Sequence, residues 1–202
     1  KEIGYRPDDI EQVILTHHHP DHVGLLDHFR GKQIVAHEKA RPWITKDEKF
    51  LATVVEYFQT LYRQHGVDEA MIEKMKKSEE RYLDFSCETD LTITVREGDR
   101  IDGLNGWKVI ETPGHAQSHI SLYCENSGVV IAGDHLIKNI SSNAILERPY
   151  TDHEDRPKTL LQYRDSLRKL LQYNITTVLP GHGERIMDAN ELIEERLLQQ
   201  EK

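Results

Sequence analysis

Short apolar runs separated by polar segments occur near the start of the chain and again through its second half, and their lengths are typical of strands. The apolar run 13–15 and the segment 33–36 predict two short strands, and the amphipathic segment Val23 to Phe29 between them predicts a short helix. Further strands are predicted at 91–95, 107–111, 120–124, 129–132 and 176–179. Turn residues such as Asn126-Ser127-Gly128 separate several of these segments, so the pattern indicates sheets with hairpin connections.

A helical pattern replaces this strand pattern from about residue 38 to 83. Its apolar side chains recur on one helical face: Leu51, Val54, Val55, Phe58, Leu61 and Tyr62. A second helix, Glu69 to Tyr82, is predicted after Gly66, and two more helices at 155–173 and 190–199. Because strands lie on both sides of this stretch, we expect one domain, 1–202, with a helical insertion at about 38–83.

A mixture of hairpin-joined strands and intervening helices predicts an α/β (α+β) fold in which helices cover the outer faces of sheets. Polar clusters follow four of the predicted strands: residues 17–22, Gly114-His115, Gly133-Asp134 and Gly181-His182. A rigid sheet positions the residues at its strand ends, and functional sites are often built there. We therefore expect these clusters to meet in one site.

Composition narrows the classes of function. The 202 residues carry a formal net charge of −9, which disfavours nucleic acid as a partner and leaves a small-molecule substrate as the expectation. No apolar run approaches the roughly 20 residues of a membrane helix. Cys87 and Cys124 have no metal-ligand spacing and indicate no disulfide framework, so a cytoplasmic location is expected. The 12 histidines are unusually many, and the sequence does not define an oligomeric state.

The first cluster, Thr16-His17-His18-His19-Pro20-Asp21-His22, has the residue types of a metal site. Alternate residues of an extended segment point the same way, so His17 and His19 can converge on one ion. Asp21 and His22 then open a helix after Pro20 and can face a second ion. Asp134 supplies a carboxylate that suits a bridge between two divalent ions.

The order HxHxDH, then His, Asp and His, resembles the metallo-β-lactamase-fold hydrolase superfamily, and the resemblance covers residues 10–187 apart from the insertion. It implies an αββα sandwich with two metal ions. By this resemblance the first ion is held by His17, His19 and His115, the second by Asp21, His22 and His182, and Asp134 is the bridge.

Two departures from the family pattern carry information. The family normally has several strands before the first motif, which this sequence does not contain, so we expect the chain to lack part of one sheet. Penicillin-cleaving members usually lack a carboxylate at the position of Asp134. The chain therefore resembles the glyoxalase II and lactonase branches, with phosphodiesterase and tRNA-processing branches beside them, and not a true β-lactamase.

The resemblance implies a metal-dependent hydrolase in which a metal-bridging hydroxide cleaves a small ester, thioester or lactone, and Asp21 orients that hydroxide and takes up its proton. Zinc is the first expectation for both ions, and iron or manganese also suits the ligands. One alternative is a phosphodiesterase or nuclease of the same superfamily. Another is a non-hydrolytic metal-binding or di-iron redox scaffold, although no flavodoxin-like domain follows Lys202.

Residues outside the motif are assigned more loosely. His119 and His135 are expected to support ligands by hydrogen bonds, and His18 is expected to face outward. Candidates for the substrate pocket are Ser141, Ser142, Asn143, Tyr57 and Tyr62. The two tyrosines belong to the insertion, for which a lid over the metals and simple helix packing remain as alternatives.

Overall fold

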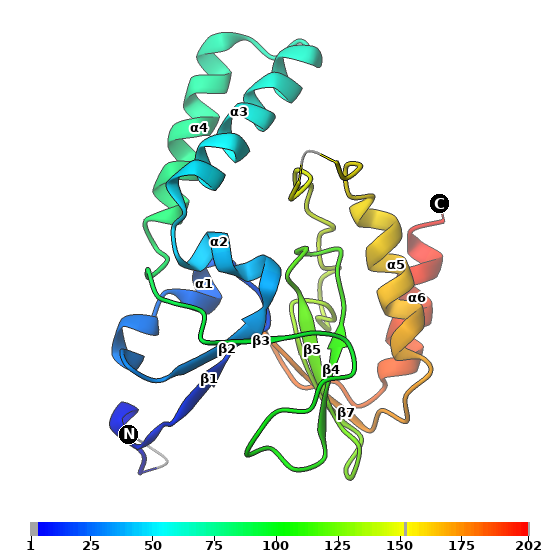
Figure 1. Ribbon diagram of the computed structural model, residues 1–202. Helices are drawn as coiled ribbons and strands as arrows, with labels where there is room; N and C mark the ends of the chain where they lie inside the picture. The colour runs from blue at the N-terminus through cyan, green and yellow to red at the C-terminus, as the bar shows by residue number, and fades with distance from the viewer. Residues whose placement is uncertain (1–3, 152, 202) are drawn as a thin grey trace.

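The computed structural model describes residues 4–151 and 153–201, which contain two β-sheets (Figure 1). The first sheet has three parallel strands in the order β1 (Gln12–Ile14), β2 (Gln33–His37) and β3 (Ile93–Val95). The second has the order β4 (Trp107–Glu111), β5 (Ile120–Cys124), β6 (Val129–Gly133) and β7 (Thr177–Pro180). Strands β4 to β6 are antiparallel, whereas β7 runs parallel to β6, so β6 and β7 end at the same edge.

Apolar side chains join the two sheets face to face. Val35 and Val95 of the first sheet share one buried cluster with Val109, Ile120 and Leu122 of the second. These are mostly β-branched residues, which pack well on a pleated surface. The interior between the sheets therefore forms the central layer of the core.

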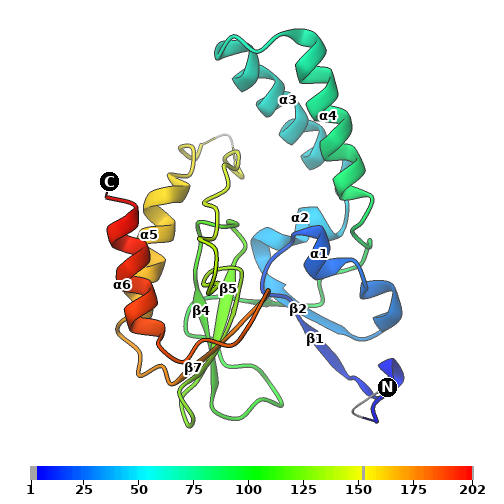
Figure 2. The same ribbon diagram turned by 180° about the vertical axis from the view of Figure 1, so that it is seen from behind.

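Helices cover the two outer faces (Figures 1 and 2). On the second sheet, α5 (Thr159–Leu170) and α6 (Ala189–Gln199) bury Tyr163, Leu167 and Ile193 against Val130. On the first sheet lie α1 (Pro20–Val23), the 3-10 helix Leu26–Phe29 and α2 (Arg41–Ile44), which share a second buried cluster. The order helix, sheet, sheet, helix confirms the predicted αββα fold.

Two long helices of the insertion, α3 (Glu48–Gln64) and α4 (Glu69–Leu83), project from the body of the molecule as a hairpin (Figures 1 and 2). Each begins at a carboxylate cap: Asp47 accepts a hydrogen bond from the backbone N–H of Phe50 at 2.9 Å, and Asp68 from that of Met71 at 3.0 Å. Gly66 lies in the turn between them with φ of +77°.

Two predicted helices differ from the structure. The helix expected at Val23 to Phe29 is replaced by α1, which starts at Pro20 and ends before Gly24, and by the separate 3-10 helix. The helix expected from residue 155 starts at Thr159, because Pro157 disfavours helical backbone in the residue before it. Among the described residues, no helix has both the length and the apolar character needed to cross a membrane.

Candidate metal centre

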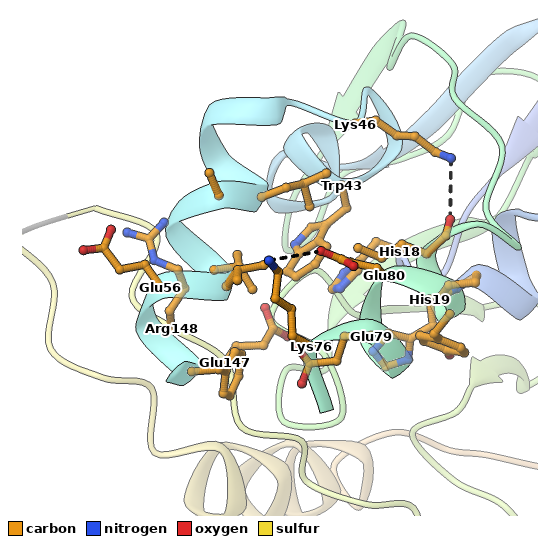
Figure 3. Close-up of a pocket in the computed structure, with 18 of the residues that line it drawn as sticks. His18, His19, Trp43, Lys46, Glu56, Lys76, Glu79, Glu80, Glu147 and Arg148 are labelled. Carbon is orange, nitrogen blue, oxygen red and sulfur yellow. Dashed lines mark hydrogen bonds and ion pairs between the residues drawn. The ribbon is translucent and has the colours of Figure 1, made fainter. Parts of the chain in front are cut away.

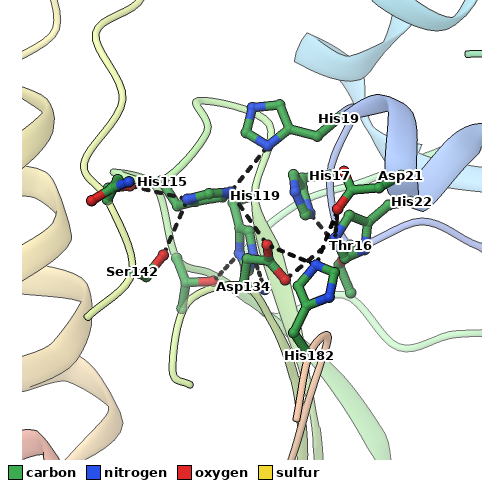
Figure 4. Close-up of polar contacts among 12 residues, drawn as sticks. Thr16, His17, His19, Asp21, His22, His115, His119, Asp134, Ser142 and His182 are labelled. Atoms are coloured by element: carbon green, nitrogen blue, oxygen red, sulfur yellow. Dashed lines mark hydrogen bonds and ion pairs between the residues drawn. The ribbon is translucent and has the colours of Figure 1, made fainter. Parts of the chain in front are cut away.

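The polar clusters predicted at strand ends meet at one edge of the two sheets (Figure 4). The segment after β1 carries His17 to His22, and α1 begins within it, at Pro20. His115 lies in the loop between β4 and β5, Asp134 directly follows β6, and His182 follows β7. The sheets thus bring together side chains that are up to 165 residues apart in the sequence.

A first group consists of His17, His19 and His115, whose nearest ring nitrogens all lie within 4.8 Å of one another. His115 Nε2 is 3.0 Å from His19 Nδ1. His115 Nδ1 donates to the backbone carbonyl of Asn143 at 3.0 Å, so in the neutral ring Nε2 carries a free lone pair. Ring nitrogens that converge at this range have the arrangement of ligands to one ion.

A second group consists of Asp21, His22, Asp134 and His182, again with one ligand atom from each within 4.8 Å of the others. His182 Nε2 is 3.0 Å from Asp21 Oδ2. Asp134 Oδ1 lies 3.3 Å from His22 Nε2, and Asp134 Oδ2 lies 3.5 Å from His182 Nε2 of the same group and 3.7 Å from His115 Nε2 of the first group. Asp134 is therefore placed between the two groups.

The protonation states suit metal binding in the first group. Burial lowers the pKa of His17 well below its ordinary value, and repulsion from the neighbouring histidines adds to this. Burial, together with His115, lowers the pKa of His19 to about 4, and burial also lowers the pKa of His115. These rings are neutral at pH 7, and a neutral imidazole is the form that binds a metal.

In the second group, contacts between histidines and carboxylates shift the pKa values of both. Burial alone would lower the pKa of His22, but contact with Asp134 and the charge of Asp21 raise it overall. Burial would raise the pKa of Asp134, but His22, His115 and His182 lower it overall. Asp134 is thus a carboxylate at neutral pH, the form that accepts a cation.

His119 supports Asp134 from behind. The backbone N–H of Asp134 donates to His119 Nε2 at 3.1 Å, so this nitrogen is unprotonated. His119 Nδ1 then carries the proton and donates to Thr112 Oγ1 at 2.8 Å. Burial keeps the pKa of His119 well below its ordinary value, which agrees with a neutral ring. This contact has the form expected of a residue that orients a ligand.

His135 and His18 differ from expectation. His135 is fully buried against the Tyr163 ring, and neither of its ring nitrogens has a hydrogen-bond partner among the described residues. The hydrogen-bonding support expected of it is therefore not seen. His18 does not face outward: it stacks on Trp43 at 4.3 Å, and its Nδ1 lies 2.8 Å from Ser118 Oγ. The far side of this extended segment faces the insertion instead of solvent.

Two of the loop residues predicted to line the substrate pocket, Ser142 and Asn143, instead contact the candidate metal ligand His115. Ser142 Oγ lies 3.1 Å from His115 Nδ1, beside the Asn143 carbonyl contact, whereas Ser141 is exposed. Both contacts hold the His115 ring with Nε2 toward the centre. Sequence reasoning had no signal for this, because a Ser-Ser-Asn run is an ordinary loop composition.

The residues present fit two divalent cations. His17 Nε2 is buried and has no hydrogen-bond partner within the described part of the chain, and the buried atoms His22 Nε2 and Asp134 Oδ1 have only the ion-pair contact with each other at 3.3 Å and that of His22 with Asp21 at 3.5 Å. Buried polar atoms without partners are costly, and a bound cation satisfies them. Gly181 adds a steric argument, since a Cβ there would meet Asp134 Oδ1 and the His22 ring. The chain thus leaves room around unpaired ligand atoms.

A pocket of about 780 Å³ opens beside the centre (Figure 3). His19 lines this pocket and also belongs to the first ligand group, so pocket and centre are continuous. The walls come from α3, α4 and residues 145–148. Of the described side chains, Phe58 lines the pocket, whereas Tyr57 and Tyr62 do not. Tyr62 instead donates a hydrogen bond to Glu79 at 3.4 Å.

Comparison with known proteins gives a consistent result. The sequence model of the Metallo-beta-lactamase superfamily matches residues 1–182. The chain is 47% identical over 191 residues to the probable metallo-hydrolase YqjP of Bacillus subtilis (strain 168), which covers 93% of the chain and 59% of that protein. Over 60 residues, 30% of the chain and 18% of the relative, it is 40% identical to the N-acyl homoserine lactonase AiiB of Agrobacterium fabrum (strain C58 / ATCC 33970).

A solved structure extends the comparison to the fold. The crystal structure of a metallo-beta-lactamase family protein from Thermus thermophilus superposes with a TM-score of 0.82 at 28% identity, and the match covers 99% of this chain and 64% of that one. The chain therefore spans about three-fifths of the length of these relatives. The extra strands expected before the first motif remain a prediction.

Proposed function

Since the chain belongs to the metallo-beta-lactamase superfamily, we propose that it is a hydrolase that holds two divalent ions and cleaves a small ester, thioester or lactone. The observation that carries this proposal is the position of Asp134, which belongs to the second ligand group and whose Oδ2 also lies 3.7 Å from His115 Nε2 of the first group. One tetrahedral zinc needs only four ligands, and the two groups supply seven residues.

Each group would hold one ion. His17, His19 and His115 would hold the first, Asp21, His22 and His182 the second, and Asp134 would contact both. Zinc is the first expectation for this His-rich set, with iron or manganese as alternatives. When bound, the two ions supply Lewis acidity and lower the pKa of a water molecule, which makes hydrolysis feasible at neutral pH.

We assign the proton transfer to Asp21. It opens α1, and its side chain is about half exposed, whereas that of Asp134 is almost fully buried. Asp21 Oδ2 also lies 3.0 Å from His182 Nε2, so the two side chains would approach the same ion together. A carboxylate held in this way at the open side of the centre can orient the attacking water and take up its proton.

The substrate class rests on charge and on the pocket. The net charge of −9 disfavours polyanions such as nucleic acids, and the pocket beside His19 has largely apolar walls. The match to a relative named as an N-acyl homoserine lactonase supports including lactones among the candidate substrates.

The test uses the protein with its metals. Purified protein is analysed for zinc, iron and manganese and assayed against a thioester, a lactone, a carboxylic ester and a phosphodiester. We expect about two ions per chain and turnover of at least one carbonyl substrate. Asp21→Asn should reduce kcat by about 10²-fold or more, as expected for loss of a general base, with the fold retained. Turnover of the phosphodiester alone would contradict the proposed substrate class.

A further inference from the structure

The pocket beside the metal centre is lined by side chains that ordinary helix packing would have buried. On α3 these are Leu51, Val55 and Phe58, and facing them are Leu83 of α4 and Ile145 of the loop after Asp134. They are only partly buried, and Ile145 is 39% exposed. A concave apolar surface next to convergent polar ligands is the usual form of a small-molecule site.

The charged groups of this pocket are predominantly acidic. Six carboxylate residues line it, Glu48, Glu56, Glu79, Glu80, Asp84 and Glu147, against three basic residues, Lys46, Lys76 and Arg148. All three basic groups are engaged. Lys76 pairs with Glu80 at 3.7 Å, Lys46 donates to the carbonyl of Leu83 at 3.5 Å (Figure 3), and Arg148 donates to Thr53 Oγ1 at 2.8 Å. An anionic occupant would face a surplus of negative charge here, whereas a neutral one would not.

One end of the pocket lies at the candidate metal centre. His18 and Trp43 stack at its floor, and His19 next to them is a candidate metal ligand. A substrate whose carbonyl lies at the ligand groups would therefore extend past His19 and between α3 and the segment 145–148.

We propose that this pocket binds the neutral, apolar acyl chain of the substrate, and that the α3–α4 hairpin sets the preferred chain length. This inference rests on the proposed function, because it assigns the acyl side of the ester, thioester or lactone to the pocket. It predicts lower kcat/KM for substrates whose acyl side is small or charged. It also places chain-length selection on Val55 and Phe58 rather than on Tyr57 and Tyr62.

Hydrolysis provides the first test. The metal-loaded protein is assayed with p-nitrophenyl acetate, hexanoate and decanoate. Each methylene group that is fully buried contributes about fourfold to binding, so kcat/KM should rise by at least about tenfold from acetate to decanoate. Phe58→Ala and Val55→Asp should abolish this preference by lowering kcat/KM for decanoate toward the value for acetate. Tyr57→Ala, at the neighbouring position of α3 outside the pocket lining, is the matched control and should keep the preference.

A binding test separates this inference from the proposed function. The chain has two tryptophans, so in a Trp107→Phe background fluorescence reports on Trp43 at the floor of the pocket. We expect 1-decanol to bind at least about tenfold more tightly than ethanol, with or without metal, and Phe58→Ala to remove the difference. Binding without hydrolysis of any ester would contradict the proposed function alone. Equal binding of the two alcohols, or loss of selectivity in Tyr57→Ala to the same extent as in Phe58→Ala, would overturn the acyl-chain pocket.

Discussion

The metal centre and the α3–α4 hairpin lie side by side but are held in place by different means. Ligands of the centre stand at strand ends, and His119 behind them is fully buried and hydrogen-bonded to Asp134 and Thr112. In the hairpin, 17-residue α3 and 15-residue α4 each bury a single side chain, Val54 and Ile72. The centre is fixed by both sheets, whereas the hairpin is fixed by few buried contacts.

The two regions therefore suit two different requirements of an enzyme: positioning the reacting groups and recognising the rest of the substrate. Reacting groups have to be held in position before the substrate arrives, and strand ends with supporting hydrogen bonds provide this. A surface that recognises the remainder of a substrate can have a lower local stability, because it only has to close around an apolar group. Changes at the centre should therefore alter metal content and chemistry, and changes in the hairpin should alter selectivity and local opening.

The largest effect is expected at Asp134. Asp134→Ala removes the side chain that faces both ligand groups, so at least one ion should be lost and the other bound less tightly. Loss of Lewis-acid stabilisation worth several kcal/mol corresponds to about a 10³-fold fall in kcat/KM. Metal analysis and substrate kinetics measure the two effects. Asp165→Ala, at an exposed position of α5, is the control. Unchanged metal content in Asp134→Ala would contradict the bridging position.

The next effect concerns Glu147, which joins the two regions. It lines the pocket, and it accepts hydrogen bonds from the backbone N–H of Gln117, near His115, at 2.6 Å and from the hydroxyl of Tyr150 at 3.0 Å. Burial outweighs these contacts and raises the pKa of Glu147 to about 7. The folded state therefore favours the protonated carboxyl, and stability from this residue is lost as the pH rises from about 4.5 to above 7.

The substitution Glu147→Gln removes this titration. Wild type and variant should be similarly stable at pH 5, and at pH 8 the variant should be more stable relative to wild type by up to about 3 kcal/mol. Urea unfolding at the two pH values measures the difference, in which the titration of the buried histidines cancels. Glu73→Gln on the exposed face of α4 should show no such pH-dependent gain. A constant difference between wild type and Glu147→Gln would mean that Glu147 is already ionised at pH 5.

A smaller effect is expected from the residue that supports Asp134. His119→Ala leaves the N–H of Asp134 without its acceptor while every candidate ligand remains. Loss of such an orienting contact typically costs 10- to 100-fold in metal affinity or activity. Competition with a chelator measures the affinity of the folded variant for zinc, and circular dichroism checks its fold. The same truncation at exposed His65 should leave the affinity unchanged, and an unaltered affinity in His119→Ala would remove His119 from the centre.

The same contrast explains what the sequence predicts and what it does not. The ligand groups could be predicted from the sequence because each candidate follows an apolar strand and belongs to a recognisable motif, as with His17 and Asp134. The pocket could not be predicted from the sequence, because its walls come from segments that are distant in sequence. Helical periodicity places Phe58, and not Tyr57, on the apolar stripe of α3, but it does not show that this stripe lines a pocket instead of packing against another helix. That distinction depends on the loop carrying Ile145, which lines the same pocket as the apolar stripe of α3.

The smallest effect should be confined to the hairpin. Gly66 has φ of +77° in the turn between α3 and α4, and a Cβ there would meet no atom within 4 Å, so Gly66→Ala introduces backbone strain alone. That strain costs about 1–2 kcal/mol, which should speed opening of the hairpin by about 5- to 30-fold. Hydrogen exchange should show this acceleration across 48–83 and not across β4 to β6. Gly66→Asn is the matched variant and should have a smaller effect, because asparagine tolerates this backbone conformation. Equal acceleration in the sheet would mean that the hairpin and the metal centre unfold as one unit.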